Sequence, residues 1–405
     1  MGLLLHALRN RSFRLLWWGQ TVSRLGDSLH RFALVWWVLQ TTGSGLAMGT
    51  VVICQTLPLL VFLLVGGVYV DRFSRIRIML ASDLARGVIT GWIAFMAVTG
   101  QLEVWHIYVA SVIFGLVDAF FQPAYSAVVP AILSPEELPS ANSLSMLSGQ
   151  LTNIVGPMLG ALLVGLGGTS LAFVLDASSF FISAVCLVPL LGLWIKLPKR
   201  GPSDRGAWHE MREGFAVITK EPWLSITIAS TAFLNATDYC AFIVTLPFMI
   251  TRTMDLDAST LGVVQSLYSV GTVGGAIWLG RRARLRRRGL VVYGLAIGLG
   301  LCTVLFGMPI TIYGIAAVVL VRGIALAINS LVFLNTMQEM VPSDTMGRVS
   351  SIDWFVSGLL MPIGFAVIGW ATDHFSPSAI FVVIGVSSMS LALIALIHPR
   401  IRTLD

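Results

Sequence analysis

Charged residues are scarce in this sequence of 405 residues: only 11% are Asp, Glu, Lys or Arg, whereas a soluble globular domain has roughly 25%. Because 56% of the residues are apolar, the folded chain has too few polar groups to cover its surface. This composition argues against a soluble enzyme. The net charge of +6 does not indicate nucleic-acid binding, because the basic residues are spread between apolar segments and no soluble domain is left to present them.

The sequence also lacks the patterns of a catalytic or metal site. It has no Gly-x-x-x-x-Gly-Lys-Ser/Thr loop, so we do not expect ATP to power it directly. No group of His, Cys and carboxylate residues has catalytic spacing, which argues against a membrane-embedded enzyme. The four cysteines fall in separate apolar runs without the spacing of metal ligands, so we expect neither a metal nor a cofactor: Cys54, Cys186, Cys240 and Cys302.

The sequence instead contains long apolar runs, each close in length to the ~20 residues that cross a bilayer as a helix. They lack the alternation of barrel strands, so the fold class is an all-α integral membrane protein. We predict twelve transmembrane helices in two pseudo-symmetric halves of six. The spans are 12–39, 45–70, 77–99, 104–129, 140–167 and 170–195, then 222–250, 259–280, 289–308, 310–336, 348–371 and 378–398.

The basic residues between these spans are distributed asymmetrically. If the N-terminus is cytoplasmic, the outer loops hold Arg252 alone, and the positive-inside rule then predicts that both termini are cytoplasmic in a plasma or inner membrane. The longest polar interruption divides the chain into an N-terminal half (1–195), a linker (196–221) and a C-terminal half (222–405). Apolar residues at helical spacing in the linker predict an amphipathic helix on the inner membrane surface, or alternatively a partner-binding helix: Trp208, Met211, Phe215 and Ile218.

A motif follows the second span. Its residues are Gly67, Asp71, Arg72 and Arg75, with Ser74 and Ile76 at two positions where the family pattern has a glycine and a basic residue, and Arg77 one place later. This motif resembles motif A of the major facilitator superfamily.

The resemblance implies an inner gate. Asp71 would accept N–H bonds at the start of the eleventh helix, near Asp353, while Arg72, Arg75 and Arg77 pair with nearby acidic groups. Alternatively, the three arginines only fix the topology.

A second resemblance covers the fourth to sixth spans and the linker, where 120–124, 141–144, 176–180 and 212–215 look like the drug and siderophore exporters of the macrolide-efflux and enterobactin-exporter branch. Gly156, Pro157 and Gly160 resemble the helix-bending motif C of antiporters, although a simple packing seam is the alternative. The fourth-span arginine of motif B is missing, because Ser111 occupies its position.

Ionisable residues inside apolar spans are the candidates for proton coupling, because a charge at the bilayer centre costs at least ~2.5–3.5 kcal/mol. Asp27 is the first candidate, with Arg31 four residues later on the same helix. Asp118 and Asp238 are also deep, and Arg322 is a candidate counter-ion. A permanent ion pair of Asp27 with Arg31, or polar packing of the other two, is the alternative. We interpret Asp83, Asp176 and Asp353 as gating or capping residues, and His30 as a polar neighbour.

Aromatic and Met residues in several spans are candidates for an apolar substrate cavity: Phe32, Trp36, Phe120, Phe121, Tyr125, Phe233, Tyr239, Phe242, Tyr268 and Met337. Together with the resemblance, these patterns predict a monomeric secondary transporter of the multidrug-efflux kind that confers antibiotic resistance, exchanging protons for amphipathic molecules. A siderophore exporter, a lipid exporter or flippase, and a proton-coupled uptake symporter are the alternatives among transporters. A membrane sensor or receptor is the alternative outside that class.

Overall fold

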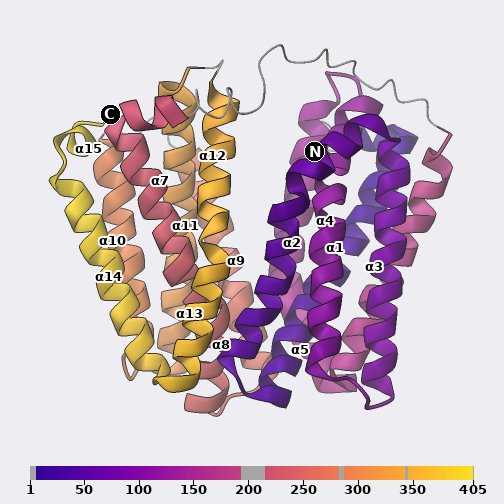
Figure 1. Cartoon of the computed structure of the whole chain (residues 1–405), viewed down its shortest axis with the longest axis horizontal. Coiled ribbons are helices and arrows are strands. Elements are labelled where there is room, and N and C mark those ends of the chain that lie inside the picture. Colours follow the sequence, from indigo (N-terminus) through magenta and orange to yellow (C-terminus); the bar gives the residue numbers. More distant parts are fainter. Residues whose placement is uncertain (1–5, 193–214, 282–286, 343–344, 405) are drawn as a thin grey trace. The chain divides into compact units, whose positions relative to one another are not determined.

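The computed structural model describes residues 6–192, 215–281, 287–342 and 345–404, and it describes the side chains of all of these except 64–72. Every regular element in these residues is a helix (Figure 1). The described residues form two compact units. Unit 1 contains residues 6–43, 50–192 and 256–266, and unit 2 contains residues 44–49, 215–255 and 267–404 with the gaps stated above.

Unit 1 is built from long helices that pack side by side, with α1 against α5 and α3 against both α4 and α5. Asn10 caps the start of α1 by accepting N–H bonds from Ser12 and Phe13 at 3.0 and 3.2 Å, and Gly43 ends it in the left-handed region at φ 57°. The elements are η1 (His6–Arg9), α1 (Arg11–Thr42), α2 (Gly45–Arg72), α3 (Arg75–Val98), α4 (Val104–Ile132), α5 (Leu138–Leu187) and η2 (Val188–Leu190).

Helix α5 is interrupted near its middle. Gly167 and Gly168 leave helical geometry, and Gly168 has φ 71° and ψ 179°, a conformation that is easily reached only without a Cβ. The interruption falls between the predicted spans 140–167 and 170–195, so a glycine pair takes the place of a loop.

In unit 2, α10 packs between α11 and α14 (Figure 1). One continuous helical segment runs from Pro222 to Thr253 and contains two stretches of wider π geometry. The elements are α7 (Pro222–Leu234), η3 (Asn235–Tyr239), α8 (Cys240–Phe248), η4 (Met249–Thr253), α9 (Ala258–Gly280), α10 (Arg288–Phe306), α11 (Ile312–Met340), α12 (Met346–Leu359), α13 (Met361–His374), α14 (Pro377–Ile397) and α15 (Pro399–Arg402). The first part of α9, up to residue 266, belongs to unit 1.

The first turn of α2 belongs to unit 2, where Asp373 at the end of α13 caps it. The Asp373 carboxylate accepts hydrogen bonds from the Ser44 hydroxyl at 2.7 Å, the Gly45 N–H at 2.5 Å and the Leu46 N–H at 3.1 Å. A carboxylate at this end of a helix satisfies the free N–H groups and interacts favourably with the helix dipole.

Nine segments of the described chain are long and apolar enough to span a membrane, and one of them is the 53-residue segment Leu138–Leu190 that contains the glycine break. Large apolar side chains are widely exposed on these helices. Val88, Phe95, Leu166 and Val185 are each at least 60% exposed, which fits a surface that faces lipid. Residues 196–214 of the linker lie outside the described residues, so the predicted amphipathic helix is described only at 215–220, which are helical.

Candidate coupling sites

Asp238 and Arg322 form a buried ion pair in unit 2. Asp238 lies in the π stretch η3, and Arg322 lies in the middle of α11. The two guanidinium nitrogens of Arg322 donate to the two carboxylate oxygens of Asp238 at 2.5 and 3.2 Å. Thr303 of α10 donates to Asp238 and accepts a 2.9 Å hydrogen bond from Arg322. The structure therefore brings together Asp238 and Arg322, two of the candidates for proton coupling.

Aromatic rings surround this pair. The guanidinium carbon of Arg322 lies 5.1 Å from the centre of the Phe242 ring, and the rings of Phe242 and Tyr268 are 4.9 Å apart. Tyr268 comes close because α9 crosses α11 at glycines. A Cβ at Gly323 would meet the Tyr268 carbonyl oxygen, and one at Gly271 would meet the backbone of α11. Two members of the predicted cavity list thus contact the buried cation or each other.

Unit 1 contains a second charged network, centred on Arg86 of α3. One Arg86 nitrogen lies 2.9 Å from a carboxylate oxygen of Asp83, and another lies 3.3 Å from an oxygen of Asp118 on α4. The second oxygen of Asp83 accepts a 2.7 Å hydrogen bond from Ser183 of α5 and lies 3.5 Å from the Gln20 amide of α1. The network therefore joins four helices, with Arg86 linking α3 to α4 and Asp83 linking α3 to α5 and α1.

Burial distinguishes the two carboxylates. The Asp83 side chain is 0% exposed, whereas 21% of the Asp118 side chain is exposed. The guanidinium carbon of Arg86 lies 4.1 Å from the centre of the Phe121 ring and 5.0 Å from that of Phe180. These rings cover the arginine, so Asp118 is the accessible end of the network and Asp83 is its buried end.

The sequence reasoning missed Arg86 and interpreted Asp83 as a gating or capping residue. The structure places Asp83 inside the network instead. The available signal was the spacing of Asp83 and Arg86, three residues apart within an apolar span, which puts them on one helix face. No sequence signal joined them to Asp118, because that contact depends on how α3 packs against α4.

His30 and Asp176 make a further buried contact between α1 and α5. His30 Nδ1 lies 3.0 Å from Asp176 Oδ2, although the angle falls outside hydrogen-bond geometry. Asp176 is 0% exposed, and the His30 ring lies between Phe114 and Phe173, with ring centres 5.5 and 5.1 Å away. Asp176 is therefore buried beside α1.

Asp27 is half-buried, and Arg31 is exposed on α1. Within the described residues Asp27 forms no ion pair, so the structure does not bring Asp27 and Arg31 together as a fixed pair. Asp176, Arg86 and Arg31 nevertheless lie close enough to interact electrostatically with Asp27. Asp27 is thus electrostatically connected to the Arg86 network without direct contact.

The predicted inner gate lies largely outside the described side chains, because those of Gly67, Asp71 and Arg72 belong to 64–72. Arg75 is buried and donates a 3.0 Å hydrogen bond to the Ala127 carbonyl oxygen, which ties α3 to α4. Arg77 is exposed.

Asp353, the predicted partner of the gate on α12, is half-buried. Its Oδ1 has no hydrogen-bond partner in the described part of the chain. The inner gate stays a prediction, because the side chain of Asp71, which is expected to contact the helix that carries Asp353, is not among the described side chains.

The residues of the motif C resemblance pack α5 tightly against α1. A Cβ at Gly156 would overlap the Ser28 side chain, and a Cβ at Gly160 would lie 2.9 Å from the Phe32 Cβ. Pro157 lies inside α5, and its carbonyl oxygen would be 2.7 Å from a Cβ at Gly262. This geometry supports a packing seam at motif C.

The other cavity candidates have varied surroundings. Phe32 is 2% exposed and packs in the seam just described, and Met337 is 3% exposed within the apolar core of unit 2. Tyr125 lies under the guanidinium of Arg24 at 5.1 Å and stacks near Phe121, with ring centres 6.2 Å apart. The remaining candidates are partly exposed: Trp36, Phe120, Phe233 and Tyr239.

Known proteins resemble this chain in sequence and in fold. The sequence model of the Major Facilitator Superfamily matches residues 16–365. Macrolide efflux protein A of Streptococcus pyogenes is 24% identical over 403 residues, 97% of each chain. Enterobactin exporter EntS of Shigella flexneri is 27% identical over 328 residues, 78% of this chain and 74% of the relative.

Two solved structures share the fold. A bacterial homologue of the iron transporter ferroportin, in its inward-facing state, has a TM-score of 0.70 at 19% identity and covers 96% of this chain and 97% of that one. The nucleoside transporter NupG has a TM-score of 0.64 at 12% identity, with 98% and 99% covered. At these identities the likeness is one of fold alone.

Proposed function

Because the chain belongs to the Major Facilitator Superfamily, we propose that it is a secondary active exporter that moves lipophilic or amphipathic molecules outward in exchange for protons. Family membership makes it a multi-pass membrane transporter and not an enzyme. The outward direction and the substrate class are supported by the macrolide and enterobactin exporters among its relatives.

The proposed topology has twelve spans with both termini in the cytoplasm. The nine apolar segments supply most of them. Helices α1 and α9 supply two more, and the glycine break at Gly167 divides α5 into two. The scarcity of basic residues in the loops assigned to the outside supports the orientation.

The charge balance of the Arg86 network is the observation that supports proton coupling. Within the described residues, Arg86 is the one cation in contact with Asp83 and Asp118. A single positive charge cannot neutralise two ionised carboxylates, and an unpaired Asp at a helix centre in the membrane costs at least ~2.5 kcal/mol. A proton on one carboxyl group removes that cost.

Asp118 is the proposed proton carrier, because it is the carboxyl group of this network that is open to exchange. Asp83 is the carboxylate that we propose stays ionised, because Arg86 and Ser183 both donate hydrogen bonds to it. Asp27 is the second carrier candidate, because it is half-buried and lies in the field of Arg86. When Asp118 loses its proton, the network carries an excess negative charge, which favours binding of either another proton or a cationic amphipathic molecule. Antiport requires such competition between the proton and the substrate for one site.

Asp238 and Arg322 have a different proposed role. One carboxylate and one guanidinium form a neutral pair with matched hydrogen bonds, so no proton is needed to balance the charge. We assign this pair to holding the helices of unit 2 together around Phe242.

The decisive experiment is transport in proteoliposomes under an imposed pH gradient. The panel includes cationic dyes, macrolides and the siderophore enterobactin, and wild type is compared with Asp118→Asn. Asparagine matches the shape of a protonated carboxyl group but cannot release a proton, so we expect loss of gradient-driven accumulation while substrate counterflow without a gradient continues. Ser126→Ala is the control, because that exposed hydroxyl donates, among the described residues, to carbonyl oxygens of its own helix at Gln122 and Pro123.

Gradient-driven accumulation at the wild-type rate in Asp118→Asn would remove this carboxyl group from the mechanism. Accumulation that follows the proton gradient in the same direction would show a symporter. A preference for the siderophore over macrolides would favour the siderophore exporter, which the enterobactin relative supports. No flux with any compound would contradict the exporter and favour a sensor.

A further inference from the structure

His30 of α1 and Asp176 of α5 face each other through two buried atoms that have no other partner. His30 Nδ1 lies 3.0 Å from Asp176 Oδ2, and within the described residues neither atom makes a hydrogen bond. Buried polar atoms are normally hydrogen-bonded, because an unpaired one loses its contacts with water and gains nothing in return. The imidazole aligns with the carboxyl group after a rotation about its terminal torsion, which is broad for histidine. A proton held between the two atoms would then satisfy both of them.

The second oxygen of Asp176 is held against the backbone of α1. A Cβ at Gly26 would lie 2.6 Å from Asp176 Oδ1, so the lack of a side chain at Gly26 lets the carboxyl group reach α1. The Ser179 hydroxyl donates to the Asp176 carbonyl oxygen at 2.7 Å and lies 3.5 Å from Asp176 Oδ1. One long contact with a hydroxyl group is too weak to stabilise a buried carboxylate by itself. The charge of Asp176 therefore depends on His30.

No arginine or lysine in the described part of the chain forms an ion pair with Asp176, which is also the only charged residue of α5. Charged groups that interact electrostatically with the neighbouring Asp27 come from three other helices: Arg31 on α1, Asp83 and Arg86 on α3, and Asp118 on α4. Arg86 is already bound to two carboxyl groups, and Arg31 is exposed. Neither arginine is therefore available to neutralise Asp176.

The pair of His30 and Asp176 is electrically neutral only when it holds one proton. With the proton on Asp176 both groups are neutral, and with the proton on His30 an imidazolium balances a carboxylate. Loss of the proton leaves a carboxylate without a cation at a position that is 0% exposed, which is costly within a membrane helix. Phe114 and Phe173 lie on two sides of the His30 ring, with ring centres 5.5 and 5.1 Å away, and they limit the access of water.

Asp27 gives the pair a route for proton exchange. It is half-buried and lies three residues before His30, on the same face of α1. Asp27 and Asp176 are close enough to interact electrostatically, so ionisation of one carboxyl group disfavours ionisation of the other. A proton that reaches Asp27 can pass to the pair, which then becomes neutral while Asp27 becomes a carboxylate. The reverse transfer protonates Asp27 and leaves neutral His30 beside ionised Asp176.

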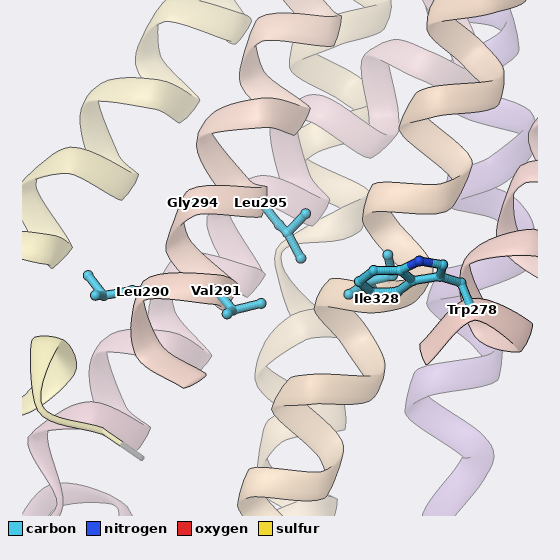
Figure 2. A pocket seen from close by; sticks show the side chains of 6 residues that line it. All are labelled: Trp278, Leu290, Val291, Gly294, Leu295 and Ile328. Atoms are coloured by element: carbon cyan, nitrogen blue, oxygen red, sulfur yellow. The ribbon is translucent and has the colours of Figure 1, made fainter. Parts of the chain in front are cut away.

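Unit 2 offers no comparable pair among its described residues. Asp238 and Arg322 carry opposite charges that balance without a proton. The groove between α9, α10 and α11, with a volume of about 320 Å³, has no titratable residue in its lining. In Figure 2, Leu295 of α10 points toward Ile328 and the indole ring of Trp278. A buried carboxyl group that needs a proton for its charge balance is thus a feature of unit 1.

We propose that His30 and Asp176 bind one shared proton and form a second proton-coupling site, reached through Asp27 and separate from Asp118. This inference rests on the proposed proton antiport. With both sites in use, one monovalent cationic substrate is exchanged for two protons. Each transport cycle then moves net charge across the membrane.

Proton binding is tested by acid–base titration of the purified full chain in detergent, between about pH 5 and about pH 8, where histidine changes its charge. The test variant combines His30→Gln with Asp176→Asn, because two amides can hydrogen-bond to each other and hold no titratable proton. We expect this double variant to bind one proton fewer than the wild type. Asp176→Asn alone is expected to lose the same proton, because a buried imidazole without the carboxylate stays neutral.

Ser179→Ala is the matched control for the titration. It removes a hydroxyl group beside the same carboxyl group, and that hydroxyl donates to a backbone carbonyl oxygen and does not titrate in this range. We expect Ser179→Ala to bind as many protons as the wild type.

Transport in proteoliposomes tests the coupling, with ethidium as the monovalent cation. A membrane potential imposed at equal pH on both sides is expected to drive ethidium transport by the wild type, because exchange of two protons for one cation moves net charge. The double variant keeps Asp118, and exchange of one proton for one cation is electroneutral. We therefore expect it to respond to a pH gradient but not to the potential, whereas damage to the fold would weaken both responses.

Equal proton binding by the wild type and the double variant would overturn the pair as a proton site. Retention of the proton in Asp176→Asn would assign it to His30 alone. A response to the membrane potential as large in the double variant as in the wild type would overturn the second coupling site. If no protein moves ethidium, the exporter of cationic molecules is contradicted, and the titration still decides whether the pair binds a proton.

Discussion

Removal of Arg322 is the most informative perturbation of unit 2, because it leaves the Asp238 carboxylate without its cation. Asp238 is 8% exposed and Arg322 is 4% exposed, so water cannot readily replace the lost partner. Breaking one side of a buried, hydrogen-bonded ion pair costs about 3–5 kcal/mol. We therefore expect Arg322→Met to lower the free energy of unfolding by that amount.

The double variant Asp238→Leu with Arg322→Met separates two explanations. If the cost of the single variant comes from an unpaired buried charge, removal of both charges restores most of the lost stability, because apolar replacements of buried pairs are often neutral or stabilising. The coupling energy between the two positions is then about 3 kcal/mol in a double-mutant cycle. If methionine simply packs badly against Phe242, the double variant is no more stable than the single one.

Thermal unfolding in detergent, followed by loss of the monodisperse species, is the assay. Arg288→Met is the matched control, because its partner Glu339 is 55% exposed and can be hydrated after the arginine is lost. That control is expected to cost less than Arg322→Met, because the carboxylate that it leaves behind is exposed to solvent. If Arg322→Met loses no more stability than Arg288→Met, the cost of an unpaired buried Asp238 is refuted. The same conclusion follows if the double variant is as unstable as Arg322→Met.

Three further predictions concern packing and capping. Gly26→Val places a Cβ against Ser179 and Asp176, so we expect a loss of about 1–3 kcal/mol in thermal unfolding, against no loss for Gly91→Ala, whose Cβ meets nothing within 4 Å. Asp373→Ala removes three hydrogen bonds from the first turn of α2 and is expected to cost about 0.5–2 kcal/mol and to speed amide exchange there; unchanged exchange would argue against the cap. Hydrogen bonds from Thr260 and Ser259 hold the pKa of Asp257 below its ordinary value of 3.8. The ionised carboxylate therefore stabilises the start of α9 fully at pH values above 3.8. This stabilisation decreases as the pH falls from 3.8 toward the lower pKa of the folded state. The melting temperature of Asp257→Asn should therefore fall less than that of the wild type between about pH 5 and about pH 2. The same fall in both proteins would contradict a stabilising role for the Asp257 carboxylate.

The membrane helices could be predicted closely from the sequence, because the length of an apolar run is set by the thickness of the bilayer. The predicted span 104–129 corresponds to Val104–Ile132, and 378–398 corresponds to Pro377–Ile397. The pair of Asp238 and Arg322 was also within reach, since charges this deep in apolar runs need partners.

Contacts between helices were harder to predict, because a sequence does not show which face of a span meets which neighbour. Asp27 and Arg31 share helical spacing, yet Arg31 is exposed and no fixed pair forms between them. Asp118 was identified as deep, but its partner Arg86 lies on another helix. Phe32 was expected beside a substrate because it is aromatic, whereas it fills the seam beside Gly160, since aromatic character does not indicate orientation.

The glycines along the seam between α1 and α5 restrict how unit 1 can change shape. Gly26, Gly156 and Gly160 leave no space for an added methyl group, so α1 packs tightly against α5 on both sides of the glycine break. If α1 slid along α5, backbone atoms would collide with side chains at each of these three glycines. The helices α1 and α5 must therefore travel together during a transport cycle, and the carboxyl groups they carry keep their spacing while their surroundings change.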